Sequence, residues 1–283
     1  MPRGLTRLRG VHTFSTLDPR PSTLDPRPPA GVIQLFLSDI DGCLSVPYQP
    51  WDLARLAEFA ALAREPHAPR LGLCTGRSYS YAEAMAQAID ARGPVLFESG
   101  AGWVDLASAA TRWHPALTDD VRAALAEARR FLEHTLVPRF AGLSVDGAKQ
   151  AQAGFVAPSE AVIEATLPEV EAFVADQLGG GFHVFHTEVS VDVVPHALTK
   201  AQAIRWVADE EQLPLDALAF IGDTGGDIEA LETVGHGFAP ANATQSVRSS
   251  AARLLDGAVL DGALEAFRWC MSYNASSSTP IAG

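Results

Sequence analysis

Apolar, β-prone runs alternate with helical stretches along much of this 283-residue chain. The runs expected to form strands are VIQLFLS (32–38), RLGLCT (70–75), GPVLFES (93–99) and LDALAFIGD (215–223). Amphipathic stretches such as WDLARLAEFAALAR (51–64) and YSYAEAMAQAIDAR (79–92) separate them. Strands that are apolar throughout are typical of a parallel sheet with helices on both faces. The sequence therefore predicts an α/β fold with a Rossmann-like, doubly wound parallel sheet at its core.

The middle of the chain has a different pattern. Short alternating runs, GLSVD (142–146), AGFVAP (153–158) and FHVFHTEVSVDVV (182–194), accompany two helical stretches at 118–136 and 159–178. This pattern predicts a small antiparallel α+β module inserted into the parallel domain. We therefore expect an inserted domain at 113–195 and a core built from 31–112 and 196–270.

Both ends of the chain lack this periodicity. The segment STLDPRP occurs twice in tandem within residues 15–28, in a proline-rich setting. Such composition is typical of a flexible tail, which we expect over residues 1–30. A second flexible tail is expected over residues 271–283.

Charge and composition exclude several classes of function. The formal net charge of −13 disfavours nucleic acid and anionic membrane surfaces as partners, since both need a basic face. No run of about 18 apolar residues predicts a membrane span, and the basic start MPRGLTRLRG lacks the apolar stretch of a secretory signal. Cys43, Cys74 and Cys270 have no metal-type spacing, and their odd number favours a reducing compartment. We therefore expect a cytoplasmic protein.

Polar residues cluster where the predicted strands end. They are Asp39 and Asp41, then Thr75, Gly76 and Arg77, then Asp223 and Asp227. In open parallel sheets ligands bind at the carboxyl ends of strands. Carboxylates that converge there repel one another unless a cation lies between them, and oxygen ligands suit Mg²⁺.

Each of these motifs, taken alone, also has a purely structural explanation. Asp-x-Asp-Gly is often a turn after a strand, Thr-Gly commonly starts a helix, and GDTGGD (222–227) fits a glycine-rich loop with an Asp N-cap. That explanation does not account for all three following strands of one sheet. The combination therefore favours a shared site.

Lysine usage adds a further candidate. Only Lys149 and Lys200 occur in the chain, so arginine is its usual cation. Lys200 lies in TKAQ, a capping-box pattern with Thr199 as N-cap and Gln202 closing it. A lysine at a helix start lies beside free backbone N–H groups, which is a natural phosphate site.

Four motifs in order, DIDG (39–42), CTGRS (74–78), TKAQA (199–203) and GDTGGD (222–227), resemble those of the haloacid dehalogenase superfamily of phosphatases. The insertion between the second and third motifs resembles a type IIB cap. The sequence is most similar to the sucrose-phosphate phosphatase and related sugar-phosphatase branch. The resemblance covers essentially all of residues 31–268.

The resemblance implies a role for each motif. Asp39 would be the nucleophile that forms an aspartyl-phosphate, and Asp41 the general acid/base. Mg²⁺ would be held by Asp39, the backbone carbonyl of Asp41, Asp223 and Asp227. The phosphate and substrate would contact the remaining candidates, which are Thr75, Gly76, Arg77, Lys149, Lys200 and Asn242.

Two positions depart from the family pattern, and the cap contributes weaker candidates. Gly226 and Ser99 stand where relatives often have Asn. The cap would recognise the substrate, with His183, His186 and Glu188 as further polar positions there.

The function expected is a Mg²⁺-dependent phosphatase that hydrolyses a phosphorylated sugar or small polyol phosphate, as a monomer or small homo-oligomer with a small-molecule substrate. A phosphosugar mutase on the same fold and a phosphoglycolate-type small-acid phosphatase are alternatives. A signalling receiver domain is disfavoured because it lacks an inserted cap. A catalytically inactive binding protein would be expected to have lost Asp39, Asp41 or Lys200, and all three are present.

Overall fold

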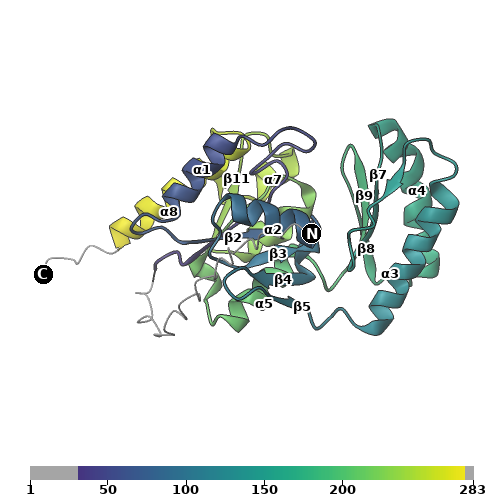
Figure 1. Ribbon diagram of the computed structural model, residues 1–283, viewed down its shortest axis with the longest axis horizontal. Coiled ribbons are helices and arrows are strands. Elements are labelled where there is room, and N and C mark those ends of the chain that lie inside the picture. The colour runs from purple at the N-terminus through teal and green to yellow at the C-terminus, as the bar shows by residue number, and fades with distance from the viewer. Residues whose placement is uncertain (1–30, 278–283) are drawn as a thin grey trace, which may run out of the picture.

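The computed structural model describes residues 31–277 and divides them into a core domain and a smaller cap (Figure 1). The flexible tail predicted over residues 1–30 lies outside the described residues. The chain leaves the core sheet after Trp113 and begins the next core helix at Lys200, and the cap lies between these points. The predicted α/β architecture with an inserted α+β cap is thus confirmed.

An eight-stranded sheet forms the core, in the order β12-β11-β10-β1-β2-β3-β4-β5. Its strands are β1 (Leu35–Ser38), β2 (Arg70–Cys74), β3 (Val95–Phe97), β4 (Gly102–Asp105), β5 (Ala110–Trp113), β10 (Leu218–Ile221), β11 (His236–Ala239) and β12 (Arg253–Leu254). The six strands from β12 to β3 pair in parallel, as predicted.

The two remaining core strands are antiparallel and were not predicted. Only the short 3-10 helix η1 (Glu98–Gly100) separates β3 from β4. A parallel partner would need a crossover of a dozen or more residues. The link between β3 and β4 is much shorter, and the chain therefore turns back on itself. The sheet therefore ends in an antiparallel edge.

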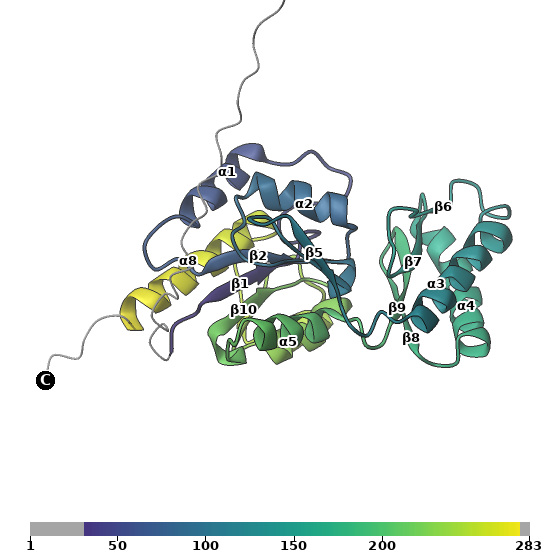
Figure 2. The same ribbon diagram turned by 60° about the horizontal axis from the view of Figure 1, so that its bottom comes forward.

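Helices cover both faces of this sheet (Figure 2). One face carries α1 (Leu53–Leu62), α2 (Tyr79–Ala88) and α8 (Leu260–Ser277), and the other carries α5 (Lys200–Glu210), α6 (Ile228–Thr233) and α7 (Gln245–Ser250). Successive side chains of β1 point to opposite faces: Phe36 joins the first cluster, and Leu35 and Leu37 join the second. Burial on both faces explains why the strand is apolar throughout.

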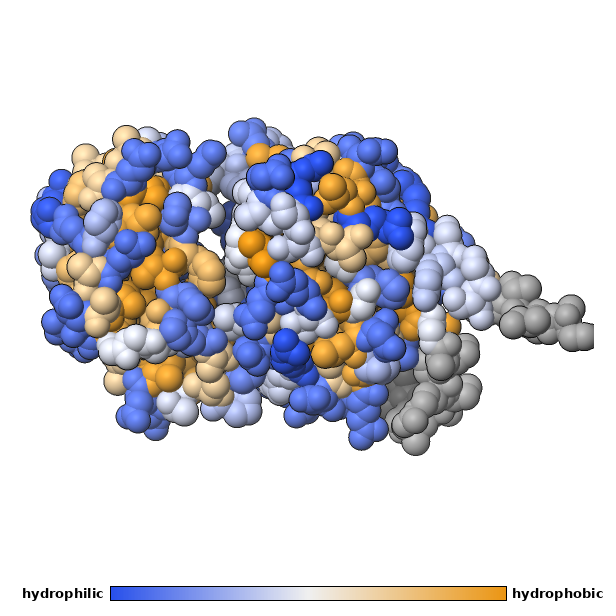
Figure 3. Space-filling model, turned by 180° about the vertical axis from the view of Figure 1, so that it is seen from behind, coloured by the Kyte–Doolittle hydropathy of each residue, from blue (hydrophilic) through white to orange (hydrophobic). Residues whose placement is uncertain are grey.

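The cap is a four-stranded antiparallel sheet, in the order β6-β7-β9-β8, packed on two long helices. Its elements are α3 (Asp119–Phe131), the π-helix η2 (Leu132–Leu136), β6 (Ser144–Val145), β7 (Ala153–Val156), α4 (Glu160–Gln177), β8 (Phe182–His186) and β9 (Ser190–Pro195). In the space-filling view the cap and the core are separate lobes with an opening between them (Figure 3).

Helix α8 corrects one boundary. A flexible tail was predicted from residue 271, but the helix continues to Ser277. The buried side chain of Asn274 accepts a hydrogen bond from the Ile33 backbone N–H at 2.8 Å and donates one to the Ile33 carbonyl at 2.9 Å. This amide fastens the last helix beside the first strand, which explains why the order extends beyond residue 270.

Among residues 31–277, the structure has no helix that is both long and apolar enough to cross a membrane.

Candidate active site

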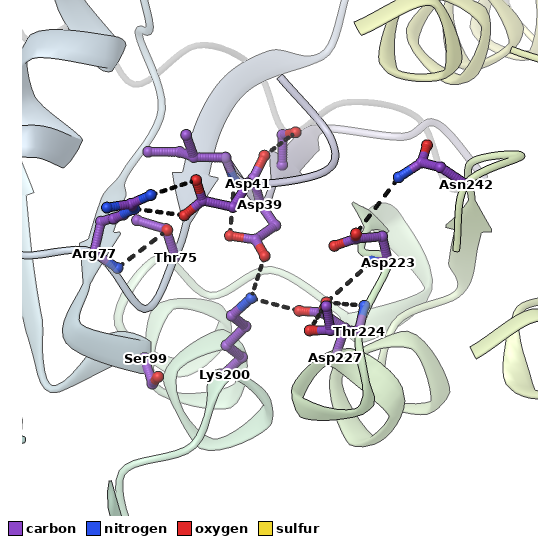
Figure 4. A network of polar contacts seen from close by, with 12 residues as sticks. Asp39, Asp41, Thr75, Arg77, Ser99, Lys200, Asp223, Thr224, Asp227 and Asn242 are labelled. Atoms are coloured by element: carbon purple, nitrogen blue, oxygen red, sulfur yellow. Dashed lines mark hydrogen bonds and ion pairs between the residues drawn. The ribbon is translucent and has the colours of Figure 1, made fainter. Parts of the chain in front are cut away.

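The candidate site lies where three adjacent strands end (Figure 4). Strand β1 pairs with β10 on one side and β2 on the other, and Ser38 lies level with Ile221 and Leu73. The residues that directly follow these strands therefore meet at one edge of the sheet. The structure thus brings together most of the predicted candidates, namely Asp39, Asp41, Thr75, Gly76, Arg77, Lys200, Asp223 and Asp227.

Asp39 is buried at the end of β1, and both its carboxylate oxygens have partners. Oδ1 accepts a hydrogen bond from the Ile40 backbone N–H at 2.7 Å, and Oδ2 contacts Nζ of Lys200 at 2.7 Å. Burial raises the pKa of Asp39 to about 6, although the charge of Lys200 opposes the shift. The carboxylate is thus held in one orientation next to a cation.

Lys200 is the first residue of α5 and reaches the site from below the sheet edge. Thr199 is the predicted N-cap, and its hydroxyl accepts a hydrogen bond from the Gln202 backbone N–H at 3.4 Å. The lysine ammonium bridges Asp39 and Asp227. Burial alone would lower the pKa of Lys200, but the charges of Asp227 and Asp39 outweigh burial and raise it well above its ordinary value. The lysine is therefore a fixed positive charge.

Asp227 is fully buried and organises the loop after β10. Its Oδ2 accepts hydrogen bonds from the backbone N–H groups of Asp223 and Thr224, both at 3.0 Å, while Oδ1 contacts Lys200. A Cβ added at Gly226 would meet no atom within 4 Å, so no side chain at that position is needed to fill the loop. The departure from the family pattern at Gly226 leaves the loop intact because Asp227 holds it.

Three carboxylates are spaced to hold one cation. Asp39, Asp223 and Asp227 each offer an oxygen, and these three atoms lie within 4.8 Å of one another. Oδ1 of Asp223 is buried without a hydrogen-bond partner. Burial, together with the neighbouring carboxylates of Asp39 and Asp227, raises the pKa of Asp223 to about 8. A buried oxygen without a partner, inside a cluster of repelling acids, fits a hard divalent cation such as Mg²⁺.

Gly42 makes room for this cluster. Its φ of +73° lies in the left-handed region, and a Cβ there would come within 1.9 Å of Oδ2 of Asp223. The glycine of DIDG is therefore required both by the backbone and by the carboxylate it faces.

Arg77 lies at this edge of the sheet, and its predicted contact with phosphate stays a prediction. In the structure its guanidinium forms a two-pronged ion pair with Asp41, with Nε to Oδ2 at 2.5 Å and Nη2 to Oδ1 at 2.7 Å. The neighbouring Thr75 is buried, and its hydroxyl accepts a hydrogen bond from the Arg77 backbone N–H at 3.2 Å. Arginine forks fit carboxylates as well as they fit phosphates, so the sequence alone does not distinguish the two partners.

Asn242 lies beside the metal-type cluster. Its Nδ2 donates to the Gly42 carbonyl at 2.9 Å and lies 3.5 Å from Oδ2 of Asp223, and its Oδ1 accepts from the Val259 backbone N–H at 2.7 Å. These contacts link three loops. Asn242 thus braces the acidic cluster, and its predicted contact with the substrate stays a prediction.

Lys149 is buried in the cap, and its ammonium pairs with Asp192 of β9 at 2.6 Å. Its placement at the substrate therefore stays a prediction. Of the other polar cap positions, the ring of His183 lies 3.8 Å from that of His196, while His186 and Glu188 line a hollow on the cap surface.

The sequence analysis missed the contacts between cap and core. Glu98 is buried at the end of β3, and its Oε2 accepts hydrogen bonds from the backbone N–H groups of Gln150 and Ala151 in the cap. The Gln152 side chain donates to the hydroxyl of Ser99 at 2.8 Å. Glu98 directly follows a buried strand, as Asp39 does, and this shared pattern could have revealed it.

Cys43 and Cys74 lie next to site residues but are buried, and burial raises the pKa of each thiol. A buried thiol that resists ionisation is a poor nucleophile. Both cysteines therefore pack as small apolar groups, as expected.

Comparison with known proteins agrees with this fold and site. The model of the haloacid dehalogenase-like hydrolase family matches residues 158–267. The phosphoglycolate phosphatase of Methanococcoides burtonii is 27% identical over 246 residues, which cover 85% of this chain and 98% of that protein. The phosphoglycolate phosphatases of Pyrobaculum aerophilum and Halobacterium salinarum are 32% and 30% identical, but the aligned regions span only 36% and 44% of those proteins.

Solved structures resemble most of the chain. A Thermoplasma acidophilum protein superposes with a TM-score of 0.66 at 17% identity, covering 86% of this chain and 98% of its own. The sucrose-phosphatase of Synechocystis, solved with sucrose and phosphate, superposes with a TM-score of 0.60 at 17% identity, covering 84% and 98%. At such identities the likeness concerns the fold.

The fold and the acidic site define a capped hydrolase of the Rossmann-like type. The predicted resemblance to the haloacid dehalogenase superfamily is confirmed by this family match and by the fold of the solved structures.

Proposed function

We propose that this protein is a Mg²⁺-dependent phosphatase that hydrolyses a phosphorylated sugar or small polyol phosphate through an aspartyl-phosphate on Asp39. The observation that carries the proposal is the contact of Asp39 with Lys200 at 2.7 Å, beside the carboxylates of Asp223 and Asp227. A cytoplasmic location and a monomer or small homo-oligomer remain predictions of the sequence.

The residues that would hold Mg²⁺ are Asp39, Asp223 and Asp227 by their carboxylates and Asp41 by its backbone carbonyl. When bound, the cation would reduce the repulsion between an anionic nucleophile and an anionic phosphate. The orphan oxygen of Asp223 supports this assignment.

In the first half-reaction a carboxylate oxygen of Asp39 attacks phosphorus, and the bond from phosphorus to the substrate oxygen breaks. Asp41 gives its proton to that leaving oxygen. The Thr75 hydroxyl, the Gly76 backbone N–H and the Lys200 ammonium stabilise the charge on the transferring group.

In the second half-reaction Asp41 takes a proton from water as the water oxygen attacks phosphorus. The bond from phosphorus to Asp39 breaks, phosphate leaves, and both aspartates return to their starting states. Lys200, whose Nζ lies 2.7 Å from Oδ2 of Asp39, is placed to keep the nucleophile oriented.

One other substrate class and one other reaction are compatible with the same site chemistry. The Methanococcoides relative, aligned over 98% of its length, favours a small phosphorylated acid of the phosphoglycolate type. The sugar phosphate that we propose follows from the resemblance of the motifs to the sugar-phosphatase branch, and the sucrose-phosphatase neighbour shares the fold. A mutase would differ by returning the phosphoryl group to the sugar instead of giving it to water.

The test is phosphate release with Mg²⁺ across sucrose phosphate, trehalose phosphate, hexose phosphates, phosphorylated glycosyl-glycerates and phosphoglycolate. The native chain is compared with Asp39→Asn and with Asp90→Asn, which removes only an exposed acid paired with Arg64 and Arg92. Turnover of one ester that is abolished by Asp39→Asn and by chelator, but kept by Asp90→Asn, supports the proposal. Isomerisation of a hexose phosphate without net phosphate release would instead identify a mutase.

A further inference from the structure

The pair formed by Arg77 and Asp41 joins the ends of two strands. Both oxygens of Asp41 accept from the guanidinium, at 2.5 and 2.7 Å. A two-pronged pair of this kind fixes the plane of the carboxylate as well as its position. The guanidinium of Arg77 therefore pairs with Asp41, a candidate catalytic residue, instead of being free to bind an anionic ligand.

Aromatic rings hold the guanidinium in turn. Its carbon lies 4.5 Å from the ring centre of Tyr81 in α2 and 6.0 Å from that of Tyr48, in the loop after β1. The ring of Tyr81 packs edge-on against Trp51, whose indole N–H donates to the Tyr81 hydroxyl at 3.3 Å. Cation–π contacts of this kind restrict an arginine side chain. Contacts with α2 and with the loop after β1 thus restrict the Arg77 side chain.

Asp41 needs such support because of where it lies. It follows the end of β1, in a tight turn where the backbone N–H groups of Cys43, Leu44 and Ser45 all point to the Ile40 carbonyl. Its side chain is 29% exposed, whereas that of Asp39 is 8% exposed and bound to Lys200. An exposed carboxylate on a turn has several rotamers open to it, and in the structure Arg77 selects one of them.

We propose that Arg77 is the positioning residue for Asp41, and that it does not bind the phosphate. The inference rests on the proposed function, because it assigns Arg77 to the positioning of the general acid/base Asp41. Tyr48 and Tyr81 contribute to this positioning, because their rings contact the Arg77 guanidinium.

This role has a kinetic signature. General acid catalysis contributes roughly 10²–10⁴-fold, and it matters most when the leaving oxygen is a poor leaving group. An alkyl phosphate releases a sugar or hydroxy-acid alcohol and needs the proton. p-Nitrophenyl phosphate releases a stable phenolate and needs it far less. Loss of a residue that places the acid should therefore slow the alkyl ester selectively.

The experiment compares kcat/KM for two esters in the native chain and in Arg77→Gln. One is p-nitrophenyl phosphate, and the other is the alkyl ester of the panel above that the native chain hydrolyses fastest. kcat/KM reports on formation of the phosphoenzyme, where the leaving group departs. We expect a fall of about 100-fold for the alkyl ester and of less than about 5-fold for p-nitrophenyl phosphate, in line with the size of general acid catalysis.

Four further variants make the result specific. Asp41→Asn sets the size of the full effect, and the double variant with Arg77→Gln should lose no more than Asp41→Asn alone, since both changes remove the same function. Arg77→Lys keeps a charge without the fork and should recover part of the alkyl-ester rate. Arg92→Gln, which breaks an exposed pair with Asp90, should change neither ester. Thermal unfolding of each variant shows whether it is folded.

The outcomes separate the two proposals. Equal losses on both esters would mean that Arg77 binds the phosphate or merely supports the fold, and no loss on either would mean that it has no role; each result overturns the inference and leaves the phosphatase intact. If the native chain releases phosphate from neither ester, the proposed function fails, and the assignment of Arg77 to an acid catalyst fails with it.

Discussion

Nζ of Lys200 lies 2.7 Å from Oδ2 of Asp39, although 161 positions separate the two residues in the chain. The whole cap is inserted between them. A buried pair formed over such a distance requires that the sheet and α5 both be in place, because neither partner can be buried alone without a large desolvation cost. The pair therefore depends on the core folding around the insertion.

Replacing Lys200 by Met should lower both the phosphatase activity and the free energy of unfolding. Asp39 and Asp227 would lose the cation between them, which we expect to cost about 3–5 kcal/mol of unfolding free energy. Loss of a charge that stabilises the transferring group should lower kcat about 10²–10³-fold. Phosphate release and denaturant unfolding measure the two effects. Arg205→Met removes an exposed cation of the same helix and should change neither, whereas an unchanged kcat in Lys200→Met would contradict its assigned role.

The acidic cluster predicts how stability depends on pH without metal. The pKa of Asp223 is raised to about 8 and that of Asp39 to about 6, whereas both titrate near 4 in an unfolded chain. Between about pH 4 and 8 the folded protein therefore binds more protons than the unfolded chain, so the free energy of unfolding falls as pH rises. The slope is at most about 1.4 kcal/mol per pH unit for each proton. Thermal unfolding in chelator at pH 6 and pH 8 measures it.

Mg²⁺ should reverse this trend, since it binds the ionised carboxylates. We expect the melting temperature to rise more on adding Mg²⁺ at pH 8 than at pH 6. In Asp223→Asn both the pH dependence and the shift with Mg²⁺ should shrink, while Asp90→Asn should keep both. Equal Mg²⁺ shifts in the native chain and in Asp223→Asn would show that the cation binds elsewhere.

Gly42→Ala should damage the same cluster by steric means. The new Cβ would lie 1.9 Å from Oδ2 of Asp223, and alanine is strained at a φ of +73°. We expect a loss of about 1–3 kcal/mol in stability and a weaker Mg²⁺ shift in thermal unfolding. Gly147→Ala is the matched control, because a Cβ there meets no atom within 4 Å. If both variants respond to Mg²⁺ alike, the close approach of Gly42 to Asp223 is not needed for the metal.

The sequence predicted the parts of this site that depend on local pattern. Apolar strands buried on both faces are recognisable, and the residues that follow them, such as Asp39 and Asp223, must share an edge of the sheet. The N-cap Thr199 likewise has a local signature, and it placed Lys200 at the start of a helix.

The features that the sequence did not predict are side-chain contacts between residues on separate elements of the chain. Arg77 could pair with a phosphate or with Asp41, and only the register of β1 against β2 brings the two side chains together. Asn242 bonds to a loop 200 positions away. Such contacts depend on how separate elements pack, which no periodicity within one element encodes.

Glu98 and Ser99 both hold the cap loop against the core, and removal of the Glu98 carboxylate should loosen that contact. Oε2 of Glu98 accepts hydrogen bonds from the backbone N–H groups of Gln150 and Ala151. Glu98→Ala would leave the buried Ala151 N–H without this partner, at about 1–3 kcal/mol, and would also free the partly buried N–H of Gln150. Since 1.4 kcal/mol is a factor of ten, we expect hydrogen exchange at these two amides to accelerate at least about tenfold.

Exchange in the paired cap strands β8 and β9 should stay unchanged, because their backbone hydrogen bonds do not involve Glu98. Glu83→Ala is the control, since Glu83 accepts only an exposed contact from Gln87 in α2. Unaltered exchange at Gln150 and Ala151 in Glu98→Ala would show that the cap loop is held without the carboxylate. Selective exposure of the two amides would instead identify the end of β3 as the point where the core holds the cap over the site.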